Sequence, residues 1–81
     1  MKKSELKNGM VVQYRNTSYS KYALVVDNLL IDLNGFMLLN DYNEDLTYSD
    51  IKDFDIVAVY KVDGFGCSLL DILNGKYLKI L

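Results

Sequence analysis

The chain has 81 residues, of which 51% are hydrophobic, with no histidine, one cysteine and a formal net charge of −2. A chain of this length forms one domain with a thin core, so we expect a single domain over residues 1–81. The lone Cys67, the lack of a signal-peptide core and the lack of any apolar stretch near roughly 18 residues predict a cytoplasmic protein. The pI of about 4.8 argues against direct nucleic-acid binding, and the lack of histidine argues against an enzyme.

Short apolar runs separated by Gly, Asn and Asp predict strands in the first half of the chain. A lead-in turn is expected at residues 4–8, and Asp27-Asn28 is expected to form a tight turn between two strands. The strands predicted in this half are residues 10–14, 22–26, 29–33 and 36–39.

The strongest hairpin signal is Asn34-Gly35, which lies between two of these runs. Both residue types tolerate the positive φ of a type I′ turn. We therefore predict a two-residue turn at Asn34-Gly35, with Leu33 and Phe36 as its flanking pair.

Residues 40–54 form the least regular segment. The spacing of Thr47 and Asp50 is that of a capping box, which predicts one helical turn around residues 49–53. Residues 56–60 follow as a strand that is apolar on both faces, and such a strand is expected in a central or doubly covered position.

The C-terminal part has the pattern of a short helix followed by a strand. Ser68 and Asp71 have capping-box spacing, and Gly75 stands where a helix-ending glycine belongs, so we expect a helix over about 69–74 and a last strand over 77–81. The apolar side chains of this helix must be covered, and we expect them to pack against the sheet. They are Leu69, Leu70, Ile72 and Leu73.

These elements predict a mainly β fold, a small SH3-like antiparallel barrel of five to six strands with a short C-terminal helix. The order resembles SH3-like barrels because a 3₁₀ turn there precedes the last core strand. Closure into a barrel would also remove the exposed edges of an apolar sheet. In this interpretation residues 66–81 are a helix-strand appendage that caps one open end.

A narrower resemblance is carried by three segments, residues 6–12, 41–47 and 54–60, of which the middle one is the most specific. Over residues 4–61 they resemble a group of small uncharacterised proteins of phages and prophages of Gram-positive bacteria. This chain departs from the group at its end, which has no tryptophan-containing tail. The resemblance implies a phage accessory protein and no catalytic residue.

Charge is distributed unevenly, with five basic residues against Glu5 in residues 1–22 and six acids against Lys52 in residues 41–55. The acidic segment begins like a calcium-binding loop, but Leu46 stands where that loop needs glycine and Lys52 where it needs glutamate. We therefore expect no catalytic residue, metal or cofactor.

The acidic segment is nevertheless the best candidate surface for a partner, because Tyr42 and Tyr48 lie in a predicted loop where burial does not account for them. Tyrosine is favoured at binding surfaces, and carboxylates steer basic partners. The simpler interpretation is a solvated loop, which must be polar in any case. The predicted partner-binding residues are Asp41, Tyr42, Glu44, Asp45, Tyr48, Asp50 and Asp53.

Two functions follow from this sequence. The first is a non-catalytic protein-binding module of phage or prophage origin that engages a protein with a basic surface. In a sharper form it inhibits a nucleic-acid-handling defence enzyme of the host, with carboxylates where phosphates would lie. The alternative is a structural or assembly subunit that forms a homo-oligomer through the apolar residues 36–39 and 69–73.

Overall fold

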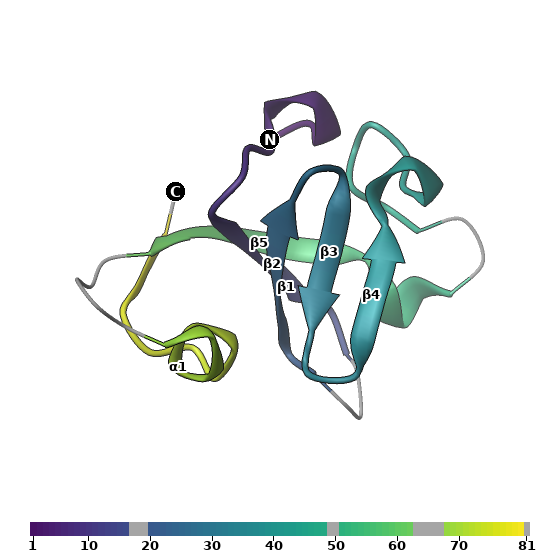
Figure 1. Cartoon of the computed structure of the whole chain (residues 1–81). Helices are drawn as coiled ribbons and strands as arrows, with labels where there is room; N and C mark the ends of the chain where they lie inside the picture. The colour runs from purple at the N-terminus through teal and green to yellow at the C-terminus, as the bar shows by residue number, and fades with distance from the viewer. Residues whose placement is uncertain (17–19, 49–50, 63–67, 81) are drawn as a thin grey trace.

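The computed structural model describes residues 1–16, 20–48, 51–62 and 68–80 (Figure 1). These residues form one antiparallel sheet in the order β4-β3-β2-β1-β5-β6, together with one short helix and three 3₁₀ turns. The strands are β1 Met10–Tyr14, β2 Tyr22–Val26, β3 Leu29–Asp32, β4 Gly35–Leu38, β5 Ile56–Val62 and β6 Leu78–Ile80. The helical elements are η1 Lys3–Glu5, η2 Leu39–Asp41, η3 Lys52–Phe54 and α1 Leu69–Leu73.

The mainly β fold is confirmed, but closure of the sheet into a barrel is not. The described strands β4 and β6 stand at opposite ends of the sheet and are not paired with each other. The chain leaves β4 at Leu39 in a 3₁₀ turn and reaches β5 only through residues 42–55. Because the described residues 42–48 and 51–55 form no strand beside β4, the sheet is open there.

Of the two tight turns predicted in the first half of the chain, the structure confirms one and shifts the other. Asp27 and Asn28 have φ values of 45° and 69°, as a type I′ turn requires, so this turn is confirmed. The turn predicted at Asn34-Gly35 is wrong by one residue, because Asp32 pairs with Gly35. The Asp32 carboxylate accepts a hydrogen bond from the Asn34 N–H (2.7 Å), which starts the turn at Asp32.

Other boundaries shift as well, and β5 extends to Val62 while β6 begins at Leu78. The strand predicted to reach residue 39 ends at Leu38, since Leu39 begins η2. The helical turn predicted around residues 49–53 is η3, which follows Ile51 without a side-chain cap. The capping role predicted from Thr47 and Asp50 is therefore wrong for Thr47, and Asp50 lies outside the described residues.

The core forms on one face of the sheet around β1. Val12 and Tyr14 of β1 pack there with Ala23, Val25, Leu30, Leu39, Tyr42, Leu46, Ile56 and Val59. Val11, on the opposite face, is also 0% exposed. Both faces of β1 are therefore covered, which explains why this strand is apolar throughout its centre.

The C-terminal appendage packs through α1 against β2. The predicted cap is confirmed, since the Ser68 hydroxyl accepts a hydrogen bond from the Asp71 N–H (3.2 Å). The helix ends in a Schellman motif at Gly75, whose φ is +84°. Leu73 is buried, but Leu69 and Leu70 are 49% and 56% exposed, so the predicted burial is wrong for these two residues. A helix of five residues buries only part of its circumference.

Glycine is required at position 75 for two separate reasons. Its replacement tests whether the C-terminal appendage contacts Tyr22 of β2. A Cβ there would lie 2.7 Å from Cε2 of Tyr22, in addition to the strain of a positive φ. We expect Gly75→Ala to lower the free energy of unfolding by about 2 kcal/mol or more. Gly9→Ala is the matched control, since Gly9 has a φ of +91° and nothing within 4 Å of a Cβ. Urea unfolding of both variants measures the difference, and equal losses would contradict the contact with Tyr22.

Candidate functional site

Tyr42, predicted as an exposed anchor, is a core residue. Its side chain is 2% exposed, and its hydroxyl donates a hydrogen bond to the Phe54 carbonyl oxygen (2.6 Å). Burial raises the pKa of this hydroxyl, with smaller contributions from neighbouring tyrosines and carboxylates. The expectation that the Tyr42 ring is exposed in a loop is therefore wrong, because the ring fills the space between the loop and the sheet.

Tyr48 is held in the same cluster of rings. It is half-buried, with its ring centroid 5.1 Å from that of Tyr42 and 5.7 Å from that of Phe54. Its N–H donates to the buried carboxylate of Asp55 (2.7 Å), which also faces Arg15 at 3.6 Å. Packing therefore accounts for part of the Tyr48 ring, and its role as a partner contact stays a prediction.

Four of the predicted acids are exposed, but two of them hold the loop together. The Glu44 carboxylate accepts a hydrogen bond from the Ser4 N–H (2.9 Å), and the Asp45 carboxylate accepts bonds from the N–H and hydroxyl of Thr47. These hydrogen bonds lower the pKa of both carboxyls. Asp41 and Asp53 are exposed at the two sides of the segment, and Asp50 lies outside the described residues.

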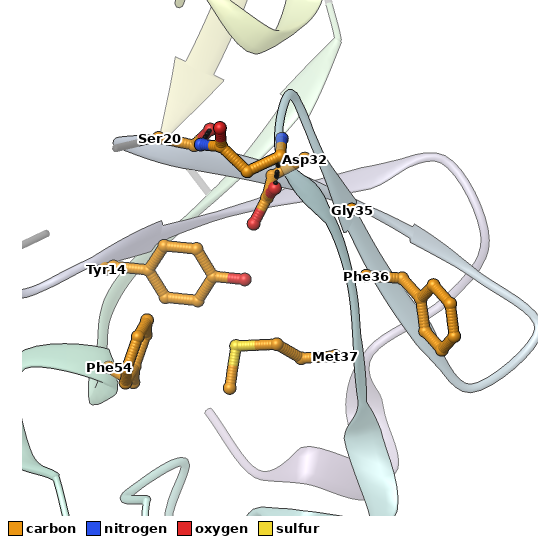
Figure 2. Close-up of a pocket in the computed structure, with 8 residues that line it drawn as sticks. Tyr14, Ser20, Asp32, Gly35, Phe36, Met37 and Phe54 are labelled. Carbon is orange, nitrogen blue, oxygen red and sulfur yellow. Dashed lines mark hydrogen bonds between the residues drawn. The ribbon is translucent and has the colours of Figure 1, made fainter. Parts of the chain in front are cut away.

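The structure brings together a different group of residues at the open end of the sheet. A hollow of about 190 Å³ lies between Tyr14 of β1, Phe54 of η3 and the β3–β4 hairpin (Figure 2). Asp32 and Met37 line it from the hairpin. A bulge in β5 pairs Tyr14 with Ile56, two residues after Phe54 in the chain. The hollow therefore lies at the end of the sheet, between β4 and η3.

The hydroxyl of Tyr14 is directed into this hollow and has no hydrogen-bond partner among the described residues. The side chain is only 2% exposed. Burial, and then the negative charge of Asp32, raise the pKa of this hydroxyl, so it stays protonated at neutral pH. A buried hydroxyl without a partner costs free energy, which makes it the most unusual polar group of the core.

Asp32 provides the negative charge of the hollow. It shares its face of β3 with the buried Leu30, because side chains two residues apart lie on the same side of a strand. Its Oδ1 is held by the Asn34 N–H, and the Asn34 amide in turn lies 3.1 Å from the Ser20 hydroxyl. This arrangement directs the carboxylate towards the Tyr14 hydroxyl, as Figure 2 shows.

The outer face of β4 is apolar and uncovered. Phe36 pairs with Ile31 and Leu38 pairs with Leu29, so these four side chains share the face that points away from the core. Phe36 is 66% exposed and its ring points away from the hollow (Figure 2). The free edge of β4, its apolar outer face and the hollow together form the candidate site, which we call the β4 site.

Sequence reasoning missed the β4 site, although one signal was present. Asp32 occupies an inward position in the alternation of β3, where an apolar side chain is the rule. A charge at such a position is a candidate for function. Tyr14 could not be found in this way, because the sequence does not reveal whether a buried hydroxyl has a partner.

Comparison of the chain with protein-family models, curated proteins and solved structures finds no match. The described residues contain no group of three or more metal-ligating side chains. No helix in the described part of the chain is long and apolar enough to cross a membrane. The function is therefore argued from the β4 site itself.

The two buried tyrosines differ in hydrogen bonding, and this difference is measurable. Tyr42→Phe removes the donor to the Phe54 carbonyl, so we expect it to cost about 1–3 kcal/mol of unfolding free energy. Tyr14→Phe removes a hydroxyl that has no partner, so we expect a change within about 0.5 kcal/mol, or stabilisation. Urea unfolding of both variants tests this, and an equal loss for the two would contradict it.

The hydrogen bond of Glu44 predicts a pH-dependent N-terminus. Because the bond from Ser4 lowers the pKa of Glu44, its stabilising effect is present above the ordinary pKa and lost as the pH falls through the lowered value. We expect hydrogen-exchange protection of the Ser4 amide to be full above the ordinary glutamate pKa of about 4.3 and to fall as the pH drops below it. Glu44→Ala should remove this step, whereas Asp41→Ala should keep it. A step that persists in Glu44→Ala would contradict this assignment.

Proposed function

We propose that the chain is a non-catalytic protein-binding accessory module that uses the β4 site to engage a protein with a basic surface. The observation that carries this proposal is the exposure of Phe36, a large aromatic side chain two-thirds exposed on an edge strand. Exposed aromatic side chains are frequent anchors of protein interfaces. A free strand edge offers backbone groups for pairing with a partner.

Charge supports a basic partner. Asp41 ends η2, which follows β4 directly, and Asp53 lies in η3 next to Phe54, which lines the hollow. Both carboxylates are exposed, and Asp32 adds a third carboxylate in the hollow itself. Such an arrangement speeds association with a positively charged surface. The acidic segment therefore keeps its predicted role in steering, while Phe36 and Leu38 replace its tyrosines as anchors.

The proposed architecture behind this function is an SH3-like barrel left open at β4. The strand order β4-β3-β2-β1-β5 and the 3₁₀ turn η3 before β5 support it. The resemblance of residues 4–61 to small phage and prophage proteins supports an accessory role, and nucleic-acid-handling host enzymes are among the partners with basic surfaces.

A second candidate function is an assembly subunit that associates with its own copies. The observation that favours it is the exposure of Leu69 and Leu70 on α1, in addition to Phe36 and Leu38 on β4. Light scattering at micromolar concentration separates the two functions. A closed oligomer supports assembly, and a monomer supports binding of a different protein.

The test of the proposed function compares Phe36→Ser with Val57→Ser. Val57 is also exposed, but it lies on β5, which three strands separate from β4. The chain is used to capture its partner from the natural host, and the affinity of the purified partner is then measured by calorimetry. We expect Phe36→Ser to weaken binding about 30-fold or more and Val57→Ser to leave it unchanged.

Binding should also weaken as salt is raised, because exposed charges are screened over about 10 Å at 0.1 M. Thermal unfolding of both variants controls for the fold, since both side chains are exposed. A partner that binds Phe36→Ser as tightly as the wild type would overturn the β4 site as its interface.

A further inference from the structure

Four polar residues line the hollow of the β4 site, and two of them, Tyr14 and Asp32, direct an oxygen atom into it. The other two, Asn34 and Ser20, are hydrogen-bonded to each other. The first oxygen is the Tyr14 hydroxyl, which is buried and has no partner among the described residues. The second is Oδ2 of Asp32, since the hydrogen bond from the Asn34 N–H uses Oδ1. Met37 and Phe54 supply apolar surface beside them. Figure 2 shows the hydroxyl, the carboxylate and the thioether of Met37 facing the same space.

This chemistry selects the ligand. A half-buried carboxylate favours a cation and repels an anion. A neutral apolar ligand would leave the Tyr14 hydroxyl without a partner, at a cost in free energy. A metal ion would find too few ligands among the described residues, because Asp32 is the one carboxylate of these that lines the hollow. A nitrogen cation with several N–H donors, in contrast, can donate to both oxygens.

The size of the hollow indicates a single side chain. Sites for drug-sized molecules measure about 300–1,000 Å³, whereas this hollow measures about 190 Å³. The apolar surface of Met37 and Phe54 suits a hydrocarbon stem that ends in a charge. Lysine and arginine both have this form.

We propose that the hollow receives a lysine or arginine side chain of the partner protein, whose cationic head lies between the Tyr14 hydroxyl and the Asp32 carboxylate. The stem of that side chain lies along Met37 and Phe54. This inference rests on the proposed function and deepens it, because it places one basic residue of the partner in one defined position beside β4.

The experiment uses small probes and needs no partner. N-acetyl-lysine methylamide and N-acetyl-arginine methylamide are titrated into protein with ¹³C-labelled methionine methyl groups. N-acetyl-norleucine methylamide is the neutral control with a similar stem. Met37 lines the hollow, while Met1 and Met10 lie outside its lining and serve as internal references. We expect a saturable shift of the Met37 methyl with one or both cationic probes and none with the neutral probe.

Variants of the two oxygen-bearing residues locate the probe. Asp32→Asn keeps an oxygen for the Asn34 N–H but removes the charge, so it should weaken binding of the cationic probe at least about tenfold. Tyr14→Phe should weaken it several-fold. Asp53→Asn, which removes an exposed charge outside the hollow, should leave it unchanged.

The inference is overturned if the cationic probes give no saturable shift, if norleucine binds equally well, or if Asp32→Asn binds as tightly as the wild type. Leu38→Ser separates this inference from the proposed function, because Leu38 is exposed on the outer face of β4 and does not line the hollow. Probe binding should survive Leu38→Ser. If the partner needs Phe36 for binding but no cationic probe binds, only this inference is overturned. If a cationic probe binds but no partner needs Phe36, only the proposed function is overturned.

Discussion

The structure depends on β1 being apolar on both faces. Val11 and Val12 are neighbours in the chain and point to opposite sides of the sheet, yet neither is exposed. The core covers the side of Val12, and a second layer must cover the side of Val11. The C-terminal appendage packs against β2, the neighbour of β1, and holds the Tyr22 ring against Gly75. Two-sided burial of β1 therefore explains why residues 68–80 return to the sheet.

The C-terminal appendage, which packs against β2, does not extend over β4. The outer face is apolar from Leu24 of β2 through Ile31 to Phe36, as the pairing of these residues shows. In Figure 1, α1 lies nearer to β2 than to β4, which stands at the end of the sheet. Exposure rises along this row, from half-buried Leu24 and Ile31 to exposed Phe36. The uncovered end of the sheet is therefore where we propose that a partner binds, beside the negatively charged hollow.

The acidic segment is a structural element before it is a charged surface. Tyr42 joins it to the core, Glu44 ties it to the N-terminal turn, and Asp55 holds both Tyr48 and Arg15. These contacts fix where the loop lies relative to η3 and β4. Its remaining exposed carboxylates thus keep a constant position beside the β4 site, which is what electrostatic steering requires.

The sequence by itself determined the features that depend on neighbours in the chain. Strands β1, β2 and β5, the type I′ turn at Asp27 and the Ser68 cap follow from alternation, turn residues and capping, which act over a few residues. The tertiary structure alone decided that Tyr42 is buried, that no described strand pairs with the outer edge of β4, and that Tyr14 lies near Asp32. These outcomes depend on contacts between residues far apart in the chain. Local patterns carry no information about which hydroxyl lacks a partner or which strand edge stays free, because both depend on how the whole sheet packs.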